Sequence, residues 1–169
     1  TVSFSYTCVN PSSCSTSQLS VSADETKNIT GTDDGSGLVY TTIDMVFDAN
    51  GSAPFNFNLP DAGEIQLHAN LTVSESLPDP AFTLTGSSNE FVVRPFAFDL
   101  GFSGNYQATS ANDTKFVSAG TAFPVTIRGV NWQAADDINN DGIPDTGSDV
   151  TNNSSTPNFG QELYAQALV

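Results

Sequence analysis

The stretch from Asp136 to Asp149, DDINNDGIPDTGSD, carries oxygen-bearing side chains at a spacing that suits calcium. Calcium takes six to eight oxygen ligands at about 2.3–2.6 Å. In a tight loop, the side chains at positions one, three, five and nine and the carbonyl at position seven converge on one point. Gly142 stands at position six, where the chain must turn sharply. The spacing predicts a structural calcium site with the ligands Asp137, Asn139, Asp141, Ile143, Asp145 and Asp149.

One position of this pattern does not suit calcium. The twelfth position should carry a bidentate carboxylate, and here it is Ser148. Asp149 comes one residue late, although either Asp136 or Asp149 could supply the missing oxygens. The flanking residues also lack a helical pattern. The alternative interpretation is that the stretch is a solvated acidic turn without a bound metal. If calcium binds, its role would be structural, because it would stiffen a long loop.

Catalytic chemistry finds little support in the sequence. Residues 145–147 form the DTG tripeptide of aspartic proteases, but that chemistry needs two carboxylates that share a proton, and only one copy occurs. His68 is the only histidine and lies on the polar side of its expected strand, so no Ser-His-Asp arrangement can be argued around it. Glycosidases need two carboxylates on opposite sides of a cleft, and the sequence does not pair any of its glutamates in this way. A glycine-rich phosphate loop is also not evident. We expect no enzymatic activity.

Two further features concern cross-linking and recognition. Cys8 and Cys14 close the short loop CVNPSSC, which favours a local disulfide in an oxidising compartment over a pair of free thiols. Trp132 lies between an expected strand and the acidic loop. A lone tryptophan in a β-sandwich is usually a core residue, and we favour that interpretation. The alternative is a ring that stacks on a sugar beside bound calcium.

Charge and composition exclude several partners. Four basic side chains oppose nineteen acidic ones, for a net charge of −15, so the chain should repel nucleic acid and anionic membrane surfaces. The sequence contains no run of 18 apolar residues, so it does not predict a membrane-spanning helix. A hydrophobic content of 38% with twelve phenylalanines argues against disorder. The abundance of Ser, Thr, Asn, Gly and Asp and the scarcity of Lys indicate an extracellular, β-rich protein.

The elements that must position these residues are short strands with alternating apolar and polar side chains. No sustained helical period occurs. Turn signals rich in Gly, Pro, Asn and Asp separate the strands, which predicts an all-β fold of tandem immunoglobulin-like antiparallel β-sandwiches, residues 1–94 and 95–169. The expected strands are 1–9, 39–47, 55–59, 64–73, 81–86, 90–93, 96–102, 115–117, 123–130 and 162–169.

The two terminal strands bear on assembly. Strand 1–9 has no strand before it, so we expect it at a sheet edge of its own unit, or else in the sheet of a neighbouring subunit. Strand 162–169 has no partner after it. Copies of the chain joined through such strands would form a filament.

Several segments resemble a known family. FDANGSAPFNFNLPDAGEIQLHA, FVVRPFAF, ATSANDTKFVSAGTAFPVTIRGVNWQAADDINNDGIPD and TPNFGQE are similar to a region of MshQ-type proteins, over about residues 40–162. These are large surface proteins associated with the mannose-sensitive haemagglutinin type IV pilus system of Gram-negative bacteria. The resemblance implies an extracellular, β-rich protein with a role in pilus biogenesis or adhesion, and it brings no catalytic residues.

Three functions remain after these observations. The first is an extracellular structural or adhesive module of a bacterial surface or pilus-associated protein, with other surface or pilus proteins as partners. The second is a self-assembling filament subunit whose partners are copies of itself. The third is a calcium-dependent carbohydrate-binding module with glycans as ligands. We rank them in that order.

Overall fold

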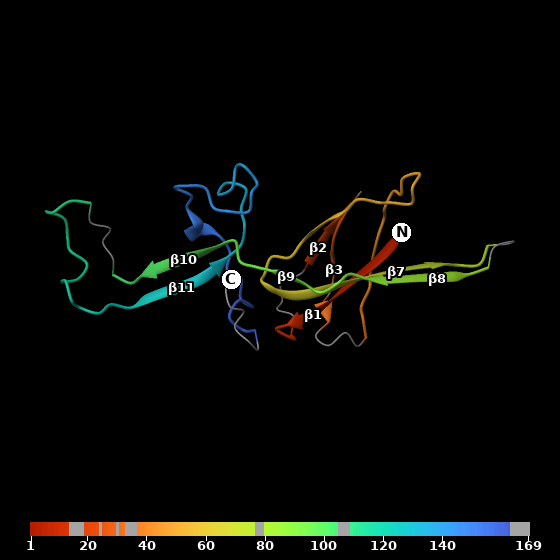
Figure 1. Cartoon of the computed structure of the whole chain (residues 1–169), viewed down its shortest axis with the longest axis horizontal. Coiled ribbons are helices and arrows are strands. Elements are labelled where there is room, and N and C mark those ends of the chain that lie inside the picture. Colours follow the sequence, from red (N-terminus) through yellow and green to blue (C-terminus); the bar gives the residue numbers. More distant parts are fainter. Residues whose placement is uncertain are drawn as a thin grey trace. The chain divides into compact units, whose positions relative to one another are not determined.

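The computed structural model describes residues 1–13, 19–23, 25–29, 31–32, 37–76, 80–104 and 109–162. The chain divides into two compact units (Figure 1). The first contains Thr1–Arg94 together with the described residues from Thr156 onward, and the second is Pro95–Ser155.

The first unit contains two sheets. The smaller sheet places β2 (Leu19–Ser22) between β3 (Thr26–Ile29) and β6 (Asn56–Asn58), with antiparallel pairing. The larger sheet follows the order β4-β1-β7-β8, with β5 also paired to β1 and β9 also paired to β7. All of its pairs are antiparallel except β1 with β4. Its strands are β1 (Val2–Asn10), β4 (Gly31–Thr32), β5 (Thr41–Ile43), β7 (Gly63–Val73), β8 (Phe82–Ser87) and β9 (Phe91–Val93).

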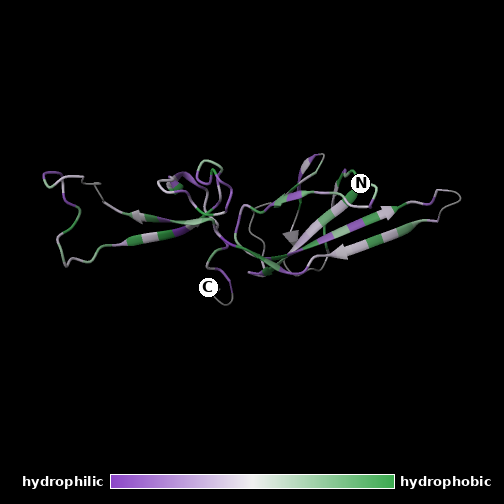
Figure 2. Cartoon of the chain, turned by 45° about the horizontal axis from the view of Figure 1, so that its top comes forward, coloured by the Kyte–Doolittle hydropathy of each residue, from purple (hydrophilic) through white to green (hydrophobic). Residues whose placement is uncertain are grey.

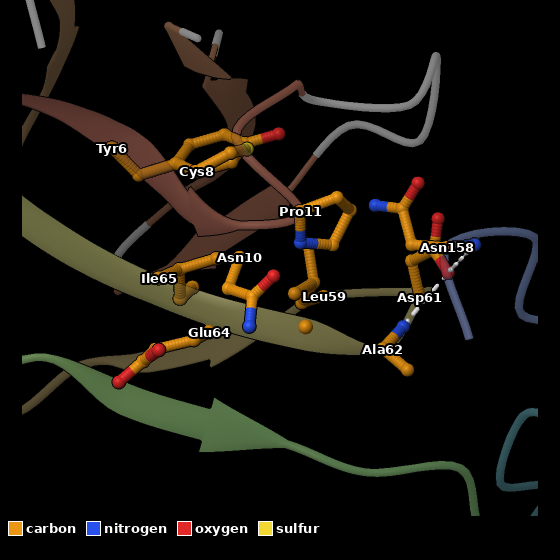
Figure 3. A pocket seen from close by; sticks show the side chains of 11 residues that line it. Tyr6, Cys8, Asn10, Pro11, Leu59, Asp61, Ala62, Glu64, Ile65 and Asn158 are labelled. Carbon is orange, nitrogen blue, oxygen red and sulfur yellow. Dashed lines mark hydrogen bonds between the residues drawn. The ribbon is translucent and has the colours of Figure 1, made fainter. Parts of the chain in front are cut away.

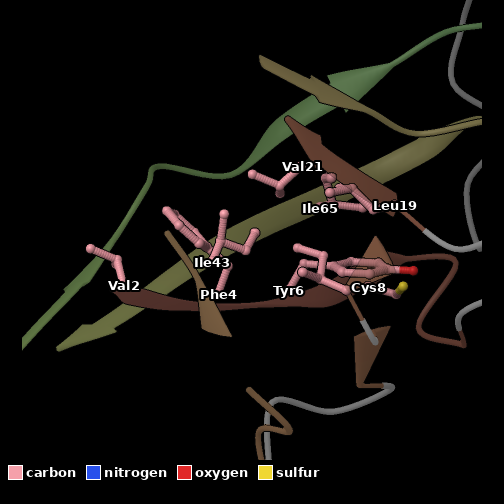
Figure 4. Packing of buried hydrophobic residues seen from close by; sticks show 9 residues of the cluster. Val2, Phe4, Tyr6, Cys8, Leu19, Val21, Ile43 and Ile65 are labelled. Carbon is pink, nitrogen blue, oxygen red and sulfur yellow. The ribbon is translucent and has the colours of Figure 1, made fainter. Parts of the chain in front are cut away.

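The core of the first unit lies where the two sheets face each other (Figure 4). Alternate residues of a strand point to the same side of a sheet, so β1 and β7 each send every second side chain inward. From the smaller sheet, Leu19, Val21 and Ile29 meet them and are completely buried. The buried cluster is Val2, Phe4, Tyr6, Cys8, Leu19, Val21, Ile29, Ile43 and Ile65. The predicted all-β class is thus confirmed, and the first unit is a β-sandwich.

The position of β1 corrects one expectation. This strand pairs with β7 on one side and with β4 and β5 on the other, so it is interior to its sheet rather than at an edge. Its side chains Phe4 and Tyr6 are core residues. The exchange of β1 between molecules would therefore dismantle the first unit. The other expected terminal strand, 162–169, lies outside the described residues except for Glu162.

The second unit is built on one two-stranded antiparallel sheet among its described residues, β10 (Ala97–Phe102) and β11 (Val125–Val130). The register pairs Asp99 with Arg128 on one face. The opposite face carries only apolar side chains or glycine and is solvent exposed at Leu100 and Ile127. A single 3₁₀ turn, η1 (Val150–Asn152), follows the acidic loop. No helix long and apolar enough to cross a membrane occurs in the described ranges.

Candidate functional site

The acidic loop is anchored at both ends in the second unit. It starts beyond β11 and ends at η1, and an isolated bridge between Val130 and Ser155 brings the two ends together. Inside the loop, the carbonyl oxygen of Asp136 accepts hydrogen bonds from the Asp145 amide at 2.8 Å and from the Ser148 hydroxyl at 2.9 Å. The loop is therefore a closed and ordered structure.

Asp137 is the centre of this loop. Its side chain is only 2% exposed. Its carboxylate accepts hydrogen bonds from Trp132 Nε1 at 2.8 Å, from the Gly142 amide at 2.9 Å and from the Asp141 amide at 3.0 Å. Burial alone raises the pKa of Asp137, but these hydrogen bonds outweigh it and hold the pKa below its ordinary value. Asp137 is therefore ionised at neutral pH and fixed in place.

Three other predicted ligands, Asn139, Asp141 and Asp145, also accept hydrogen bonds from backbone amides within the loop. Asn139 Oδ1 accepts from the Asp141 amide at 3.2 Å, and Asp141 Oδ1 accepts from the Ile143 amide at 2.9 Å. Asp145 Oδ2 accepts from the Ile138 amide at 2.9 Å. These bonds fold the backbone around the side chains at positions one, three, five and nine. Gly142 provides the turn with φ of 77°, a conformation that favours glycine.

Asp149 has a different role from the other predicted ligands. Its carboxylate caps η1, because Oδ1 accepts from the Thr151 hydroxyl at 2.5 Å and from the Thr151 amide at 3.1 Å. The Thr151 hydroxyl, followed by the Thr151 amide, lowers the pKa of Asp149. Asp136 or Asp149 was expected to supply the oxygens that are missing at position twelve of the calcium pattern. In the structure, the Asp149 carboxylate is engaged in capping η1.

Two buried oxygens beside the loop have no hydrogen-bond partner, Asp136 Oδ2 and Asn153 Oδ1. Asp136 is 4% exposed and Asn153 is 1% exposed. A buried acceptor without a donor costs about 1–3 kcal/mol, so such groups usually meet water or an ion. Asp136 was one of the two expected substitutes for the twelfth ligand, whereas nothing in the sequence pattern singled out Asn153. Among the described residues, no three side chains of the types His, Cys, Asp and Glu form a group that could hold a metal.

The structure corrects the favoured interpretation of Trp132. Its side chain is 45% exposed and is not a core residue. The indole N–H is satisfied by Asp137 Oδ2, and this bond fixes one edge of the ring against the acidic loop. An indole that needs a hydrogen-bond acceptor is readily placed beside a carboxylate.

In the first unit, a small pocket of about 10 Å³ lies beside Asp61 (Figure 3). Asp61 is buried, and its Oδ1 accepts from the amides of Ala62 at 2.8 Å and Asn158 at 3.0 Å. This contact ties the described C-terminal segment to the first unit. The volume suffices for about one water molecule, so the pocket is a structural joint. Gly63 closes it with φ of 143°, and an added Cβ there would lie 3.1 Å from the Asn10 carbonyl oxygen.

The predicted disulfide depends on a residue that lies outside the described ranges. Cys8 belongs to β1 and is 6% exposed, within the buried cluster of the first unit. Cys14 is among the residues that are not described. The pairing of Cys8 with Cys14 stays a prediction.

His68 is not a simple surface residue. Its Nε2 lies 2.8 Å from Thr7 Oγ1 on β1, and its Nδ1 lies 2.9 Å from Ser87 Oγ on β8. The ring thus links three neighbouring strands on the outer face of the larger sheet. Burial lowers the pKa of His68 from its ordinary value of about 6.5.

This lowered pKa predicts a pH dependence of stability. Below about pH 6.5 the unfolded chain binds a proton at His68 more readily than the folded chain, so the free energy of unfolding falls as the pH falls through this window. We expect the urea midpoint to be lower at pH 5.5 than at pH 7.5. In His68→Gln the difference between the two midpoints should shrink. An unchanged difference would assign the pH dependence to other groups.

Comparisons with known proteins identify a family for this architecture. One family model, described as a domain of unknown function (DUF6701), first Ig-like domain, matches residues 1–87. A second, described as DUF6701, second domain, matches residues 94–168. No curated protein and no solved structure gives a significant match. The chain belongs to the DUF6701 family, with an Ig-like first domain followed directly by the second domain of that family.

Proposed function

We propose that this chain is an extracellular structural and adhesive module of a bacterial surface or pilus-associated protein. The observation that carries the proposal is that an Ig-like β-sandwich is followed in the chain by a second all-β unit, with the division between Arg94 and Pro95. Modules of this kind serve as spacers and as binding surfaces, although the fold alone does not determine a function. The low content of basic residues and the resemblance to MshQ-type proteins support a surface location.

The location is tested with antibodies raised against the purified chain. Immunogold labelling of intact cells should equal the labelling of permeabilised cells, because a surface protein is accessible without permeabilisation. A cytoplasmic protein of known abundance serves as the control and should be labelled only after permeabilisation. Labelling of our protein that requires permeabilisation would refute the proposed location.

The proposal includes one structural calcium ion in the acidic loop. Two observations support this proposal: the hydrogen bonds of Asp137 and Asp141 to backbone amides fold the loop around these side chains, and Asp136 Oδ2 is a buried oxygen with no donor. Calorimetric titration should give a Kd of about 10⁻⁴–10⁻³ M or tighter, the range of extracellular calcium modules. Melting temperatures should be higher in calcium than in chelator. An absence of heat together with equal melting temperatures would leave a solvated acidic loop.

A second candidate is calcium-dependent carbohydrate binding, favoured by the exposed ring of Trp132 beside Asp137. An exposed tryptophan that is held at one edge offers a flat surface on which a sugar ring can stack. A glycan array probed with and without calcium decides this point. Binding that requires calcium and is lost in Trp132→Ala would support it, and an array without signal in calcium would exclude it.

A further inference from the structure

The inner face of the larger sheet in the first unit is longer than the smaller sheet that covers it. The buried cluster uses the part of β7 around Ile65, but the apolar side chains continue along the strand to Val73. The register pairs Val73 with Phe82, Leu71 with Leu84 and Ala69 with Gly86, which places all six on the same side as Ile65. Figure 2 shows the alternation of hydrophobic and hydrophilic residues along this β7–β8 hairpin.

These side chains remain exposed to solvent. Val73 is 36% exposed, Phe82 47% and Leu84 58%. Contiguous apolar surface of this kind usually marks an interaction site in a soluble protein. The face of the β7–β8 hairpin formed by Leu71, Val73, Phe82, Leu84 and Gly86 is called the open face below.

A groove of about 420 Å³ adjoins the open face. It is lined by inward residues of β1 and β7 and by residues of the segment between β5 and β6. The ring centroids of Phe55, from this segment, and Phe4, from β1, lie 5.1 Å apart. Gly86, Ser87 and Ser88 form the border toward β8, and a Cβ added at Gly86 would meet no atom within 4 Å. The groove is therefore open across Gly86, from the side of β8.

The outer edge of β8 pairs with no described strand, because β8 ends the strand order of its sheet. Its sequence, FTLTGS, has neither a charge nor a proline, the features that usually protect an edge strand. Main-chain donors and acceptors at such an edge can pair with an extended segment. The edge, the open face and the groove thus favour the same type of ligand.

Charge decides which extended segment fits. Neither Lys nor Arg occurs in residues 44–76 or 80–93, whereas these ranges contain Asp44, Asp48, Asp61, Glu64, Glu75 and Glu90. Lys27 donates to the Thr42 carbonyl on β5, but its charge is paired with Glu25. The local field is therefore negative and favours a cationic partner. A second copy of this chain has a net charge of −15 and would be repelled.

We propose that β8 accepts an extended segment of a partner protein, with apolar residues at alternate positions and Lys or Arg at its ends. The segment pairs antiparallel or parallel with β8, and its inward side chains lie beside Phe82 and Leu84. The residue beside Gly86 is large and apolar, and its side chain passes over Gly86 into the groove. This inference rests on the proposed function, because it names the surface and the class of partner through which the module adheres.

The test uses a labelled peptide and fluorescence anisotropy. The probe is a nine-residue peptide of alternating threonine and valine with a central phenylalanine and a lysine at each end. The phenylalanine peptide should bind about tenfold more tightly than the same peptide with a central alanine, because a buried phenylalanine contributes about 1.5–3 kcal/mol. Equal affinities would overturn the role of the groove. Equal binding of a peptide with glutamate ends would overturn the choice of a basic partner.

Matched variants locate the binding surface. Leu84→Asp should weaken binding by about tenfold or more, because it places a charge on the open face. Thr85→Asp makes the same charge change on the same strand but on the opposite face, and it should change the affinity less than about threefold. Gly86→Val should remove the preference for phenylalanine over alanine, since its side chain fills the entrance to the groove. Equal effects of the two aspartate variants would overturn the proposal.

Two further outcomes separate this inference from its alternatives. Dimerisation of the purified chain that is lost in Leu84→Asp, as measured by sedimentation, would replace the partner protein with a second copy. A chain that is labelled on intact cells but binds none of the peptides would refute this inference alone. A chain that binds the peptides but is found inside cells would refute the proposed function instead.

Discussion

Replacing Asp137 with alanine is expected to loosen the acidic loop and to abolish the heat of calcium binding. The substitution removes the acceptor of three hydrogen bonds, from Trp132, Asp141 and Gly142, at a position that is 2% exposed. Donors that lose a buried partner are not readily compensated by water. Cleavage within the loop by a broad-specificity protease should become roughly tenfold faster. The emission of Trp132, the only tryptophan, reports the same change.

Asp113→Ala is the matched control for this variant. Its carboxylate also accepts backbone amides, from Thr109 at 2.9 Å and Ser110 at 2.8 Å, but it does so in an exposed turn outside the acidic loop. The control removes the same charge and should leave both the calcium heat and the loop cleavage rate unchanged. Full calcium heat in Asp137→Ala would show that this carboxylate is not a ligand. A comparable loss in both variants would indicate a general effect of charge.

The local geometry of the loop was predictable because its hydrogen bonds are local. The contacts of Asn139 and Asp141 join residues two positions apart, and Gly142 turns the chain where the pattern requires it. The burial of Asp136 and Asn153 was not predictable. Asn153 follows η1 and lies beside the end of β11, where its Nδ2 donates to the carbonyl of Asn131, 22 residues earlier in the sequence. Spacing along the sequence does not encode such a contact.

The strands show the same limit. Long alternating segments predicted β1, β7 and the pair β10–β11, because period two is clear over six or more residues. The short strands β2 and β3 were not predicted, although they supply Leu19, Val21 and Ile29 to the core. A strand of four residues with one or two apolar positions is too short for the alternation of apolar and polar residues to be recognised. Conversely, residues 115–117 were expected as a strand and form none.

Pairing between strands lay beyond the pattern as well. The sequence indicates which residues alternate, but it does not show which neighbours lie on each side of a strand. The interior position of β1 therefore had to come from the structure, and it removes the strand that we expected to be free for exchange. One sheet edge without a described partner strand lies instead at β8, near the middle of the sequence. Acceptance of a segment at β8 is therefore the strand-mediated contact that we propose for the first unit.

The largest loss of stability in the second unit is expected from Arg128→Ala. Its described residues include only two buried hydrophobic side chains, Phe96 and Val130, so polar contacts must hold the unit together. Arg128 provides three of them: Nε donates to Asp99 Oδ2 at 2.8 Å, and the two Nη atoms donate to the carbonyl oxygens of Asn153 at 3.0 Å and Thr151 at 2.6 Å.

Loss of these contacts should cost about 2–3 kcal/mol, since hydrogen bonds to charged groups contribute about 1.5–3 kcal/mol each and Arg128 is partly exposed. The free energy of unfolding of a small protein is only about 0.05–0.15 kcal/mol per residue. For the 61 residues of this unit (155 − 94 = 61), the loss is a large fraction of the total. The unfolding transition followed by Trp132 fluorescence should move to lower urea, while the circular dichroism transition of the first unit should stay in place.

Two variants test whether the effect belongs to the guanidinium group. Arg128→Lys keeps the charge but loses the planar fork that reaches three acceptors, so its transition should lie between those of the alanine variant and the wild type. Lys115→Ala removes a positive charge from an exposed side chain of the same unit and should shift the transition little. If Arg128→Ala moved the unfolding transitions of both units equally, the stabilising effect of this side chain would not be confined to the second unit. A shift in the second unit alone would show that η1 and the acidic loop are held to β11 through this side chain.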